Sequence, residues 1–434
     1  MTTLCRQSLL SVKAQKGKKM NALNRTWDKL ISQKIKETKD SGSRWRPAFH
    51  IAPPVGWLND PNGLCQYKGR YHAFYQYSPF DEKGGLKFWA HCTSKDMLHW
   101  KLEGVPLVPD QPYDCHGVYS GSAVIEDDRM YLYYTGNVKE EGAYDYINQG
   151  RQANTVRAVS YDGIHFERKE LLLTNGDYPL DLTCHVRDPK VWKKNGRWYM
   201  VQGTRTKEDQ GVVLLFTSGD GVKWFCTHRL KSPKAFGYMW ECPDLYEVDG
   251  YTVLSISPQG VEADGLRYNN VYQSVTTFLD SDFRTTSVNG SFRELDGVLC
   301  QNPIRELDAY WTKEQPIENE FTGLAGSAFE IELPALDKVE ENVKITLAEQ
   351  LWLTYDRESR IFRMEFRDRQ LGAGRTMRGR KIEKLTDMRV IVDASCVEVF
   401  LNGGKDVFST RFYPDGEEIR KTVNAPGAAG RLRA

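Results

Sequence analysis

Four stretches of the sequence share one pattern and decide the predicted fold: KGRYHAFYQ (68–76), DDRMYLYYTG (127–136), NGRWYMVQG (195–203) and VDGYTVLSIS (248–257). Each begins with Gly, Asp or Asn residues that form turns and continues with alternating aromatic or aliphatic residues, as a β-hairpin does. The copies recur at intervals of roughly 40–70 residues, which is the size of a β-propeller blade. The sequence therefore predicts four blades between residues 46 and 296, and a generic antiparallel sandwich is the alternative.

A second motif recurs on the same frame. Ser-x-Asp followed by three residues and an aromatic residue occurs at Ser94–Trp100, Ser160–Phe166 and Ser218–Trp224. The segment Leu279–Phe283 (LDSDF) is a weaker fourth copy. Two motifs that repeat together favour a propeller domain, which we place at residues 46–308.

The chain on either side of this domain has different patterns. In the N-terminal extension, residues 1–45, apolar residues at helical spacing within Ala22–Thr38 predict an amphipathic helix on the outside of the main body. Residues 325–434 predict an all-β second domain, a β-sandwich, because seven runs there read as strands. These runs are Phe329–Leu333, Val343–Leu347, Leu351–Tyr355, Ile361–Phe366, Met388–Val392, Cys396–Leu401 and Val407–Phe412.

Composition excludes several function classes. The 434 residues contain 59 Lys and Arg against 58 Asp and Glu, and this balance argues against a nucleic-acid partner. The nine cysteines are odd in number and include no C-x-x-C pair, which is typical of reduced thiols in a cytoplasmic protein. A signal-peptide core and an apolar run long enough to span a membrane are both missing from the sequence, and we expect no membrane partner.

Three acidic residues lie in unusual sequence settings, each close to one of the repeated strands. Asp60 lies in WLNDPNG (57–63), Asp188 in HVRDPKVW (185–192) and Glu241 in MWECPDL (239–245). Equivalent blade positions converge on the central channel of a propeller, so the three side chains are expected to share one pocket. Two carboxylates on either side of a glycosidic bond are the apparatus of glycoside hydrolysis. Each Asp-Pro pair could also be a simple turn.

The local sequence suggests different acidities for two of these groups. Asp60 is surrounded by Asn residues and turn N–H groups, and hydrogen bonds from these would keep its carboxylate ionised. Glu241 lies between Trp240 and Cys242, and apolar neighbours would raise the pKa of its carboxyl group by desolvation. A low-pKa nucleophile and a high-pKa acid are the pairing that glycoside hydrolysis requires.

WLNDPNG, RDP and ECP, in this order and at about these distances, resemble the three acidic motifs of glycoside hydrolase family thirty-two. That family contains invertases, fructan hydrolases and sucrose-6-phosphate hydrolases. The resemblance covers roughly four fifths of the chain. Further similar segments are FYQY (74–77), FWAHCTSKDMLHW (88–100), YSGSA (119–123), YYTGN (133–137) and RVIVDASCVEVFLNGGKDVFSTRFYP (389–414).

The resemblance implies a five-bladed β-propeller followed by a β-sandwich, and the activity of a retaining β-fructofuranosidase that needs no metal or cofactor. It implies that Asp60 is the nucleophile and Glu241 the acid/base, and that Asp188 holds sugar hydroxyls and stabilises the transition state. Arg187 would offset the charge of Asp188 and bind hydroxyls. Other residues at pocket-lining positions are Asn59, Gln76, Trp89, Tyr119 and Ser120, although Trp89 could instead pack within a blade and Ser120 could be an ordinary strand hydroxyl.

Within the family, the thiols and the absence of a secretion signal most resemble bacterial cytoplasmic sucrose-6-phosphate hydrolases. The chain departs from the family after SFRELD (291–296), where roughly fifty residues, most of the fifth blade, are missing. Either four blades form an open ring, or the N-terminal helix fills the gap. The alternative functions are a fructan hydrolase and a catalytically impaired, sugar-binding deletion variant.

Overall fold

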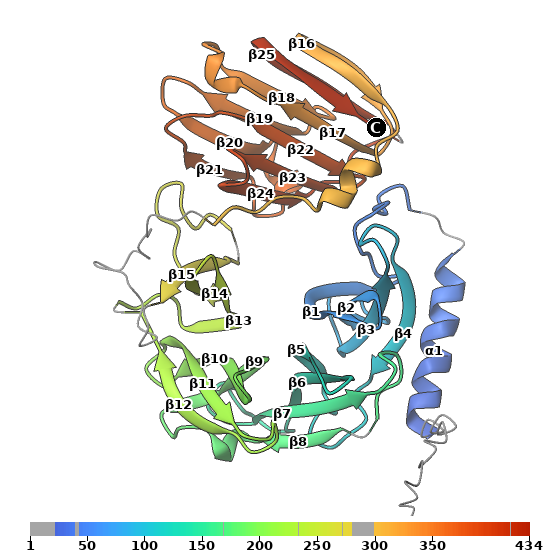
Figure 1. The fold of residues 1–434 in the computed structure, drawn as a ribbon, viewed down its shortest axis with the longest axis vertical. Coiled ribbons are helices and arrows are strands. Elements are labelled where there is room, and N and C mark those ends of the chain that lie inside the picture. The colour runs from blue at the N-terminus through green and yellow to red at the C-terminus, as the bar shows by residue number, and fades with distance from the viewer. Residues whose placement is uncertain are drawn as a thin grey trace, which may run out of the picture.

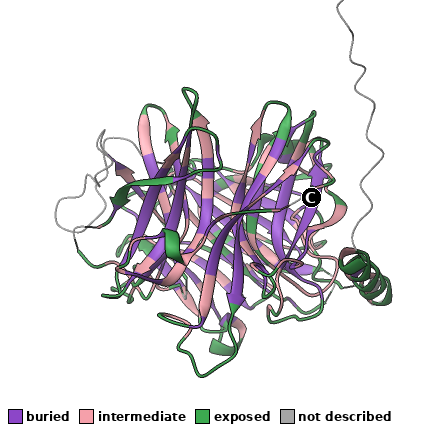
Figure 2. Cartoon of the chain, turned by 90° about the horizontal axis from the view of Figure 1, so that it is seen from below, coloured by how far each residue is buried: buried purple, intermediate pink, exposed green. Residues whose placement is uncertain are grey.

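The computed structural model describes residues 22–39, 43–167, 169–232, 234–270, 272–279, 299–416 and 418–434. The described chain is all-β apart from short helices and one long N-terminal helix. Figure 1 shows two parts: four small sheets around an open ring, and one large sheet beside them. Buried residues follow the middle of the strands, whereas exposed residues gather in the connections and on the N-terminal helix (Figure 2).

The four small sheets are antiparallel, and each runs in chain order from its first strand to its last. The predicted hairpins are confirmed, because every repeat stretch forms the second strand of its sheet (β2, β6, β10 and β14). The sheets consist of β1 (Trp57–Tyr67), β2 (Arg70–Ser78), β3 (Phe88–Ser94) and β4 (Lys101–Leu107); β5 (Val118–Glu126), β6 (Arg129–Lys139), β7 (Arg151–Ser160) and β8 (Glu170–Leu173); β9 (Leu182–Lys194), β10 (Arg197–Thr206), β11 (Gly211–Ser218) and β12 (Phe225–Leu230); and β13 (Met239–Val248), β14 (Tyr251–Gln259) and β15 (Val275–Leu279).

The ring is open between the fourth sheet and the first (Figure 1). Four propeller-like sheets are as predicted, and the residues that the structure describes form no fifth small sheet in the ring. The predicted joint at Asp296-Gly297 and most of the weak LDSDF copy lie outside the described residues.

The Ser-x-Asp motif forms the same turn in three sheets. In each copy the Asp carboxylate accepts two backbone N–H groups that lie two and three residues further along the chain. The Ser hydroxyl bonds the same Asp, as in the pair Ser160 and Asp162 at 3.1 Å. The aromatic residue at the end of each motif then packs into a hydrophobic cluster, as Trp224 does.

The predicted amphipathic helix is α1 (Ala22–Lys39). Its apolar side, which includes Trp27, Ile31 and Ile35, packs against a cluster on the first sheet that contains Tyr77 and Phe88. Figure 1 places α1 along the outer side of that sheet, beside β4. The helix therefore covers the outside, as predicted, and the alternative that it fills the gap in the ring is wrong.

The large sheet has ten strands in the order β21-β20-β19-β18-β25-β17-β22-β23-β24, with β16 paired to β25. It curls around one apolar core and is sandwich-like. All seven predicted strands are present; β16, β21 and β25 were missed. Its strands are β16 (Glu314–Ala325), β17 (Ala328–Leu333), β18 (Val343–Leu347), β19 (Leu351–Asp356), β20 (Ile361–Phe366), β21 (Met377–Lys381), β22 (Met388–Asp393), β23 (Cys396–Leu401), β24 (Asp406–Arg411) and β25 (Ile419–Arg433). The short helices of the described chain are η1 (Asn175–Asp177), η2 (Arg305–Ala309), η3 (Leu336–Lys338) and α2 (Arg369–Gly372).

The large sheet contacts both ends of the open ring. On one side the buried Asp393 accepts the backbone N–H groups of Ala48, Phe49 and His50 at 2.6, 3.1 and 2.9 Å. On the other side Leu266, in the loop after β14, lies against Gly379 of β21, 3.2 Å from where a Cβ would be. The two contacts tie together sheets that have no direct partner across the opening. None of the helices in the described part of the chain is long and apolar enough to cross a membrane.

Candidate active site

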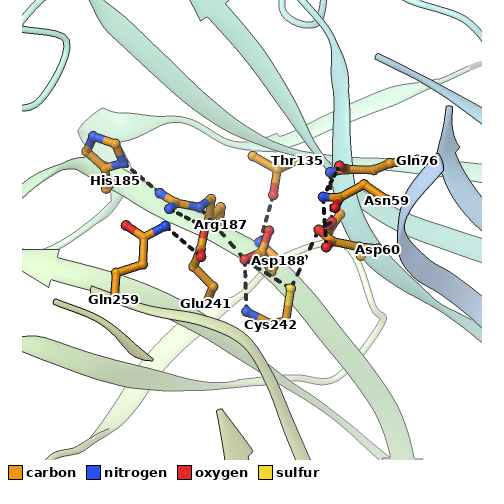
Figure 3. A network of polar contacts seen from close by, with 12 residues as sticks. Asn59, Asp60, Gln76, Thr135, His185, Arg187, Asp188, Glu241, Cys242 and Gln259 are labelled. Atoms are coloured by element: carbon orange, nitrogen blue, oxygen red, sulfur yellow. Dashed lines mark hydrogen bonds and ion pairs between the residues drawn. The ribbon is translucent and has the colours of Figure 1, made fainter. Parts of the chain in front are cut away.

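The innermost strand of every small sheet is irregular at the same place. The pairing register shifts between Leu58 and Pro61 on β1, between Tyr119 and Gly121 on β5, and between Glu241 and Asp244 on β13. On β9 it shifts between Arg187 and Lys190. A β-bulge re-aims a side chain. In this ring the bulges direct Asp60, Asp188 and Cys242 toward one another (Figure 3), and Ser120 bonds Asp60.

Two of these residues have left-handed backbone conformations. The φ angles are 62° for Asp188 and 46° for Cys242, and each residue precedes a proline. A non-glycine residue in this region costs on the order of 1–3 kcal/mol, and such residues concentrate at functional sites. The following proline also disfavours the right-handed helical region for the residue before it. The left-handed conformation is not the extended one that a following proline favours, so the surrounding sheets must hold it.

Asp60 is held by a polar network from the first two sheets. Ser120 Oγ donates to Asp60 Oδ2 at 2.5 Å, and Asn59 Nδ2 donates to Asp60 Oδ1 at 2.9 Å. Gln76 joins the two sides, because it accepts from Asn59 at 3.1 Å and donates to Ser120 at 2.8 Å. Four of the predicted site residues therefore lie in one hydrogen-bond network (Figure 3).

Asp188 is almost completely buried at the centre of the site. Its Oδ2 accepts the backbone N–H of Cys242 at 2.9 Å and lies 3.8 Å from Arg187 Nε. The thiol of Cys242 lies 3.7 Å from Asp188 Oδ2 and 3.8 Å from Asp60 Oδ2. Cys242 therefore bridges two of the three acids, and the carboxylates of Asp60 and Asp188 are separated by a single sulfur atom.

Glu241 faces polar groups. Arg187 Nη2 donates to its Oε1 at 2.7 Å, and Gln259 Nε2 donates to its Oε2 at 2.7 Å. The neighbouring Trp240 points away from the carboxylate and donates its indole N–H to the carbonyl of Phe236. The predicted apolar setting of Glu241 is therefore wrong, since sequence neighbours on a strand point to opposite faces of the sheet.

The electrostatics of Asp60 also differ from the sequence prediction. Burial raises the pKa of Asp60, and the hydrogen bond from Ser120 only partly offsets this effect. The prediction that turn N–H groups keep the pKa low is wrong, because the hydrogen bonds come from side chains and the effect of burial outweighs them. Burial raises the pKa of Asp188 to about 7, although the charge of Arg187 lowers it. Burial also raises the pKa of the Cys242 thiol well above its usual value, so that the bridging group is a neutral donor.

The remaining predicted residues have different positions. Tyr119 is half-buried, and its ring lies under Lys87 with the ammonium nitrogen 5.4 Å from the ring centroid. Trp89 is fully buried, and its indole N–H donates to the carbonyl of Tyr119 at 3.1 Å. This position matches the packing alternative for Trp89, which supports the strand that carries Tyr119 and Ser120.

Sequence reasoning missed four residues of the network. Gln259 is the last residue of the strand of the fourth repeat, and Gln76 lies near the end of the strand of the first; this parallel was the available signal. Thr135 accepts the backbone N–H of Asp188, and His185 contacts the guanidinium of Arg187 at 2.6 Å. Both lie in segments quoted above, YYTGN (133–137) and HVRDPKVW (185–192), but these segments do not reveal the contacts, which arise through sheet packing. Cys242 was read only as an apolar neighbour.

Comparison with known proteins agrees with this geometry. The N-terminal domain of glycosyl hydrolases family 32 matches residues 50–299, and the C-terminal domain of that family matches residues 312–429. The chain is 34% identical to a sucrose-6-phosphate hydrolase of Bacillus subtilis, over 88% of this chain and 92% of that protein. It is 33% identical to a raffinose invertase of Escherichia coli, over 88% of this chain and 93% of that protein.

A solved β-fructofuranosidase of Bombyx mori has a closely similar fold. It superposes with a TM-score of 0.79 at 29% identity, and the match covers 94% of this chain and 98% of that one. A variant of the Bombyx mori enzyme has been solved in complex with sucrose. The fold, both family domains and the acidic site agree, and the chain is a member of glycosyl hydrolase family 32.

Proposed function

We propose that this protein is a retaining β-fructofuranosidase that hydrolyses sucrose 6-phosphate, or sucrose, to fructose and glucose 6-phosphate or glucose. The observation that carries the proposal is the meeting of Asp60, Asp188 and Glu241, from three different sheets, in one network joined by Arg187 and Cys242. The relatives named for sucrose-6-phosphate hydrolysis and for invertase activity support the substrate class.

In the proposed mechanism an oxygen of the Asp60 carboxylate attacks the anomeric carbon of the fructosyl unit. The bond to the glucosyl oxygen breaks, and Glu241 donates a proton to that oxygen, so that the glucose part leaves and a fructosyl ester remains on Asp60. Water then attacks the anomeric carbon, the bond from this carbon to the Asp60 oxygen breaks and frees the carboxylate, and Glu241 takes up the proton that the water loses. Two displacements at one carbon return the original configuration.

The other residues position these groups. Ser120 and Asn59 fix both oxygens of Asp60, which favours an attack along one direction. Arg187 and Gln259 fix both oxygens of Glu241 in the same way. Asp188, buried between the two, is placed to accept hydrogen bonds from sugar hydroxyls and to stabilise the positive charge of the transition state. We propose that Gln76 and Tyr119 line the pocket and that Trp89 acts by positioning Tyr119.

Three further features belong to the proposal. We place the catalytic domain at residues 46–308 and the second domain at residues 325–434, and we expect the protein in the cytoplasm, where its thiols stay reduced. The eight cysteines of the described chain are all free. The described site residues lie on the four sheets that are present, so an open ring is compatible with a complete set of acids.

The test is the release of glucose 6-phosphate from sucrose 6-phosphate by the purified protein, with sucrose in parallel. Asp60→Asn and Glu241→Gln should each lower kcat on the order of 10⁴-fold or more, because each removes a reacting group. Asp128→Asn, an exposed carboxylate in the turn between β5 and β6, is the matched control and should keep the activity of the parent protein.

The outcomes separate the candidate functions. Release of fructose from inulin or levan at a higher rate than from sucrose would replace the proposal by a fructan hydrolase. No release from any of these substrates by a folded protein that still binds sucrose would identify a non-catalytic sugar-binding variant. Proton NMR of the first fructose released should show retained configuration, and an inverted product would overturn the role of Asp60 as nucleophile.

A further inference from the structure

A cluster of three cationic side chains lies beside the acidic site and takes no part in the mechanism above. Lys87 precedes β3, Lys139 ends β6 and Arg151 begins β7. Lys139 and Arg151 are directly paired across the two strands. Like charges directly opposite each other in a sheet are destabilising, so this arrangement calls for an explanation in function.

Aromatic rings and one histidine connect the cluster to the site. The Lys87 ammonium lies 5.3 Å from the ring centroid of Trp57 and 5.4 Å from that of Tyr119, and both rings belong to strands that carry catalytic-site residues. Arg151 Nη1 lies 3.2 Å from His185 Nδ1, which in turn contacts Arg187. Arg187 binds Glu241, so Arg151 is two side chains away from the group that protonates the leaving oxygen.

The cations of this cluster are not neutralised within the described part of the protein. Lys87, Lys139 and Arg151 form no ion pair with any carboxylate of the described residues. The buried Nε of Arg151 has no hydrogen-bond acceptor there. The nearby Glu140 accepts from the amide of Gln152, and Asp145 accepts the backbone N–H groups of its own loop. Asp60 and Asp81 attract Lys87 at a distance but form no ion pair with it.

The effects of neighbouring charges on the pKa values of Lys87 and Arg151 indicate that the cations of the cluster lie close together. Burial lowers the pKa of Lys87 and the charge of Lys139 lowers it further, while Asp60 and Asp81 oppose this and Arg151 adds a smaller lowering effect. Burial also lowers the pKa of Arg151, and the charge of Arg187 adds to this effect. Lys87 already donates to the carbonyls of Gly84 and Gly85, so an anion placed among these groups would relieve the repulsion and accept chiefly from Arg151, whose Nε has no acceptor.

We infer that Lys87, Lys139 and Arg151 form a binding site for the phosphate group of a phosphorylated sugar. The phosphate of sucrose 6-phosphate is carried by the glucosyl unit, which leaves from the side of Glu241, and the chain Glu241, Arg187, His185, Arg151 runs to that side. The planar guanidinium of Arg151 offers paired donors to a phosphate, while the two lysines act as point charges. This inference rests on the proposed function and specifies its substrate.

The experiment measures kcat/KM for sucrose 6-phosphate and for sucrose in parallel. Arg151→Gln and Lys139→Gln should each lower the ratio of the two values by about 10- to 100-fold, because a charged hydrogen-bonding partner of the phosphate is lost. Lys101→Gln is the matched control, since Lys101 is an exposed cation on β4 that pairs with Glu103, and it should leave the ratio as in the parent protein.

Each outcome either supports or overturns the inference. An equal loss with both substrates would show that Arg151 and Lys139 act only on the fold or on Glu241, and an unchanged ratio would place the phosphate elsewhere. Glucose 6-phosphate should inhibit sucrose hydrolysis more strongly than glucose, and Arg151→Gln should remove this difference. If inorganic phosphate at the same concentration inhibits as strongly as glucose 6-phosphate, the cluster is a free-phosphate site rather than a substrate subsite. A parent protein that cleaves neither sugar contradicts the proposed function itself.

Discussion

At the scale of single residues, the site is built from four equivalent positions with different side chains. Asp60, Ser120, Asp188 and Cys242 occupy the bulge of the innermost strand in successive sheets. A register shift at the same place in four sheets, with a left-handed residue in two of them, therefore supplies two carboxylates and two neutral donors. The neutral donors separate the charges: Ser120 bonds Asp60, and the thiol of Cys242 lies between Asp60 and Asp188.

The burial of Asp188 predicts a pH-dependent cost in stability. Its pKa is about 7 in the folded protein and 3.8 as a model group, so the folded state holds a proton that the unfolded state releases between these values. The contribution of this carboxyl group to stability is therefore lost as the pH rises from 4 to 7, by up to a few kcal/mol. Asp188→Asn should melt a few °C higher relative to the parent protein at pH 8 than at pH 5.

Thermal unfolding at both pH values measures this difference. Asp244→Asn is the control. Asp244 lies on β13, the innermost strand of the next sheet; its carboxylate pairs with Lys190, and 41% of its side chain is exposed. A difference in melting temperature that stays constant from pH 5 to pH 8 would contradict the raised pKa of Asp188.

At the scale of elements, α1 covers an apolar face of the first sheet. Trp27 meets Phe88 edge to face with ring centroids 5.2 Å apart, and Ile31 is only 3% exposed in the same cluster. The helix has no acidic residue in its first turn, so its stability comes from this packing rather than from its own ends.

Replacing Ile31, which packs between α1 and the first sheet, by a smaller residue should destabilise the protein. Ile31→Ala should cost about 2–4 kcal/mol, because it leaves a cavity between the helix and the sheet. Leu30→Ala is the matched control, since the adjacent Leu30 is 42% exposed, and its effect should stay within about 0.5 kcal/mol. Denaturation by urea measures both changes. Equal effects of the two substitutions would mean that α1 does not pack on the first sheet in solution.

At the scale of the whole molecule, the large sheet helps to stabilise the open ring of four small sheets. Four sheets leave an opening, and the second domain contacts the ring on both sides of it, through Asp393 and through the contact of Leu266 with Gly379 (Figure 1). An apolar cluster that contains Phe49, Leu307 and Phe400 adds to the first contact. The two domains are therefore expected to unfold together.

Asp393 is the residue on which this coupling depends. It accepts three backbone N–H groups and lies 2.8 Å from His50 Nδ1, and its own pKa is lowered by these bonds despite burial. Asp393→Asn should lower stability by about 3 kcal/mol at pH 7, because His50 and the N–H groups lose a charged acceptor, and it should split a single unfolding transition into two. The exposed Asp415→Asn is the control.

The pH dependence gives an independent check on this contact. Burial opposes the charged form of His50, but the hydrogen bonds to Asp393 and Glu398 outweigh it and raise the pKa of His50 to about 9. The stabilisation from His50 is therefore complete below pH 6.5 and is lost as the pH rises through 9. Calorimetry should show the stability deficit of Asp393→Asn shrinking between pH 7 and pH 10. A deficit that does not change with pH would exclude the ion pair as its cause.

The amino-acid sequence by itself determined the local structure of this protein. The hairpins, the Ser-x-Asp turns and seven strands of the second domain follow from turn residues and from alternation with period two, which are properties of neighbours along the chain. The acids Asp60, Asp188 and Glu241 could also be found from the sequence, because each motif lies close to one of the repeated strands. Strands such as β16 and β25 were missed, since Gly, Pro and charged residues interrupt their alternation and they are stabilised by pairing, β16 with β25 and β25 also with β17 and β18.

Tertiary structure alone decided the electrostatics and the support of the site. Glu241 faces Arg187 and Gln259 rather than Trp240, and burial rather than local hydrogen bonding governs the acidity of Asp60. Such effects depend on groups from other sheets and on the exclusion of water, which no local pattern encodes. The same is true of the cationic cluster: Lys139 and Arg151 are neighbours on one hairpin, but Lys87 belongs to another sheet, and only the arrangement of the sheets brings it near them.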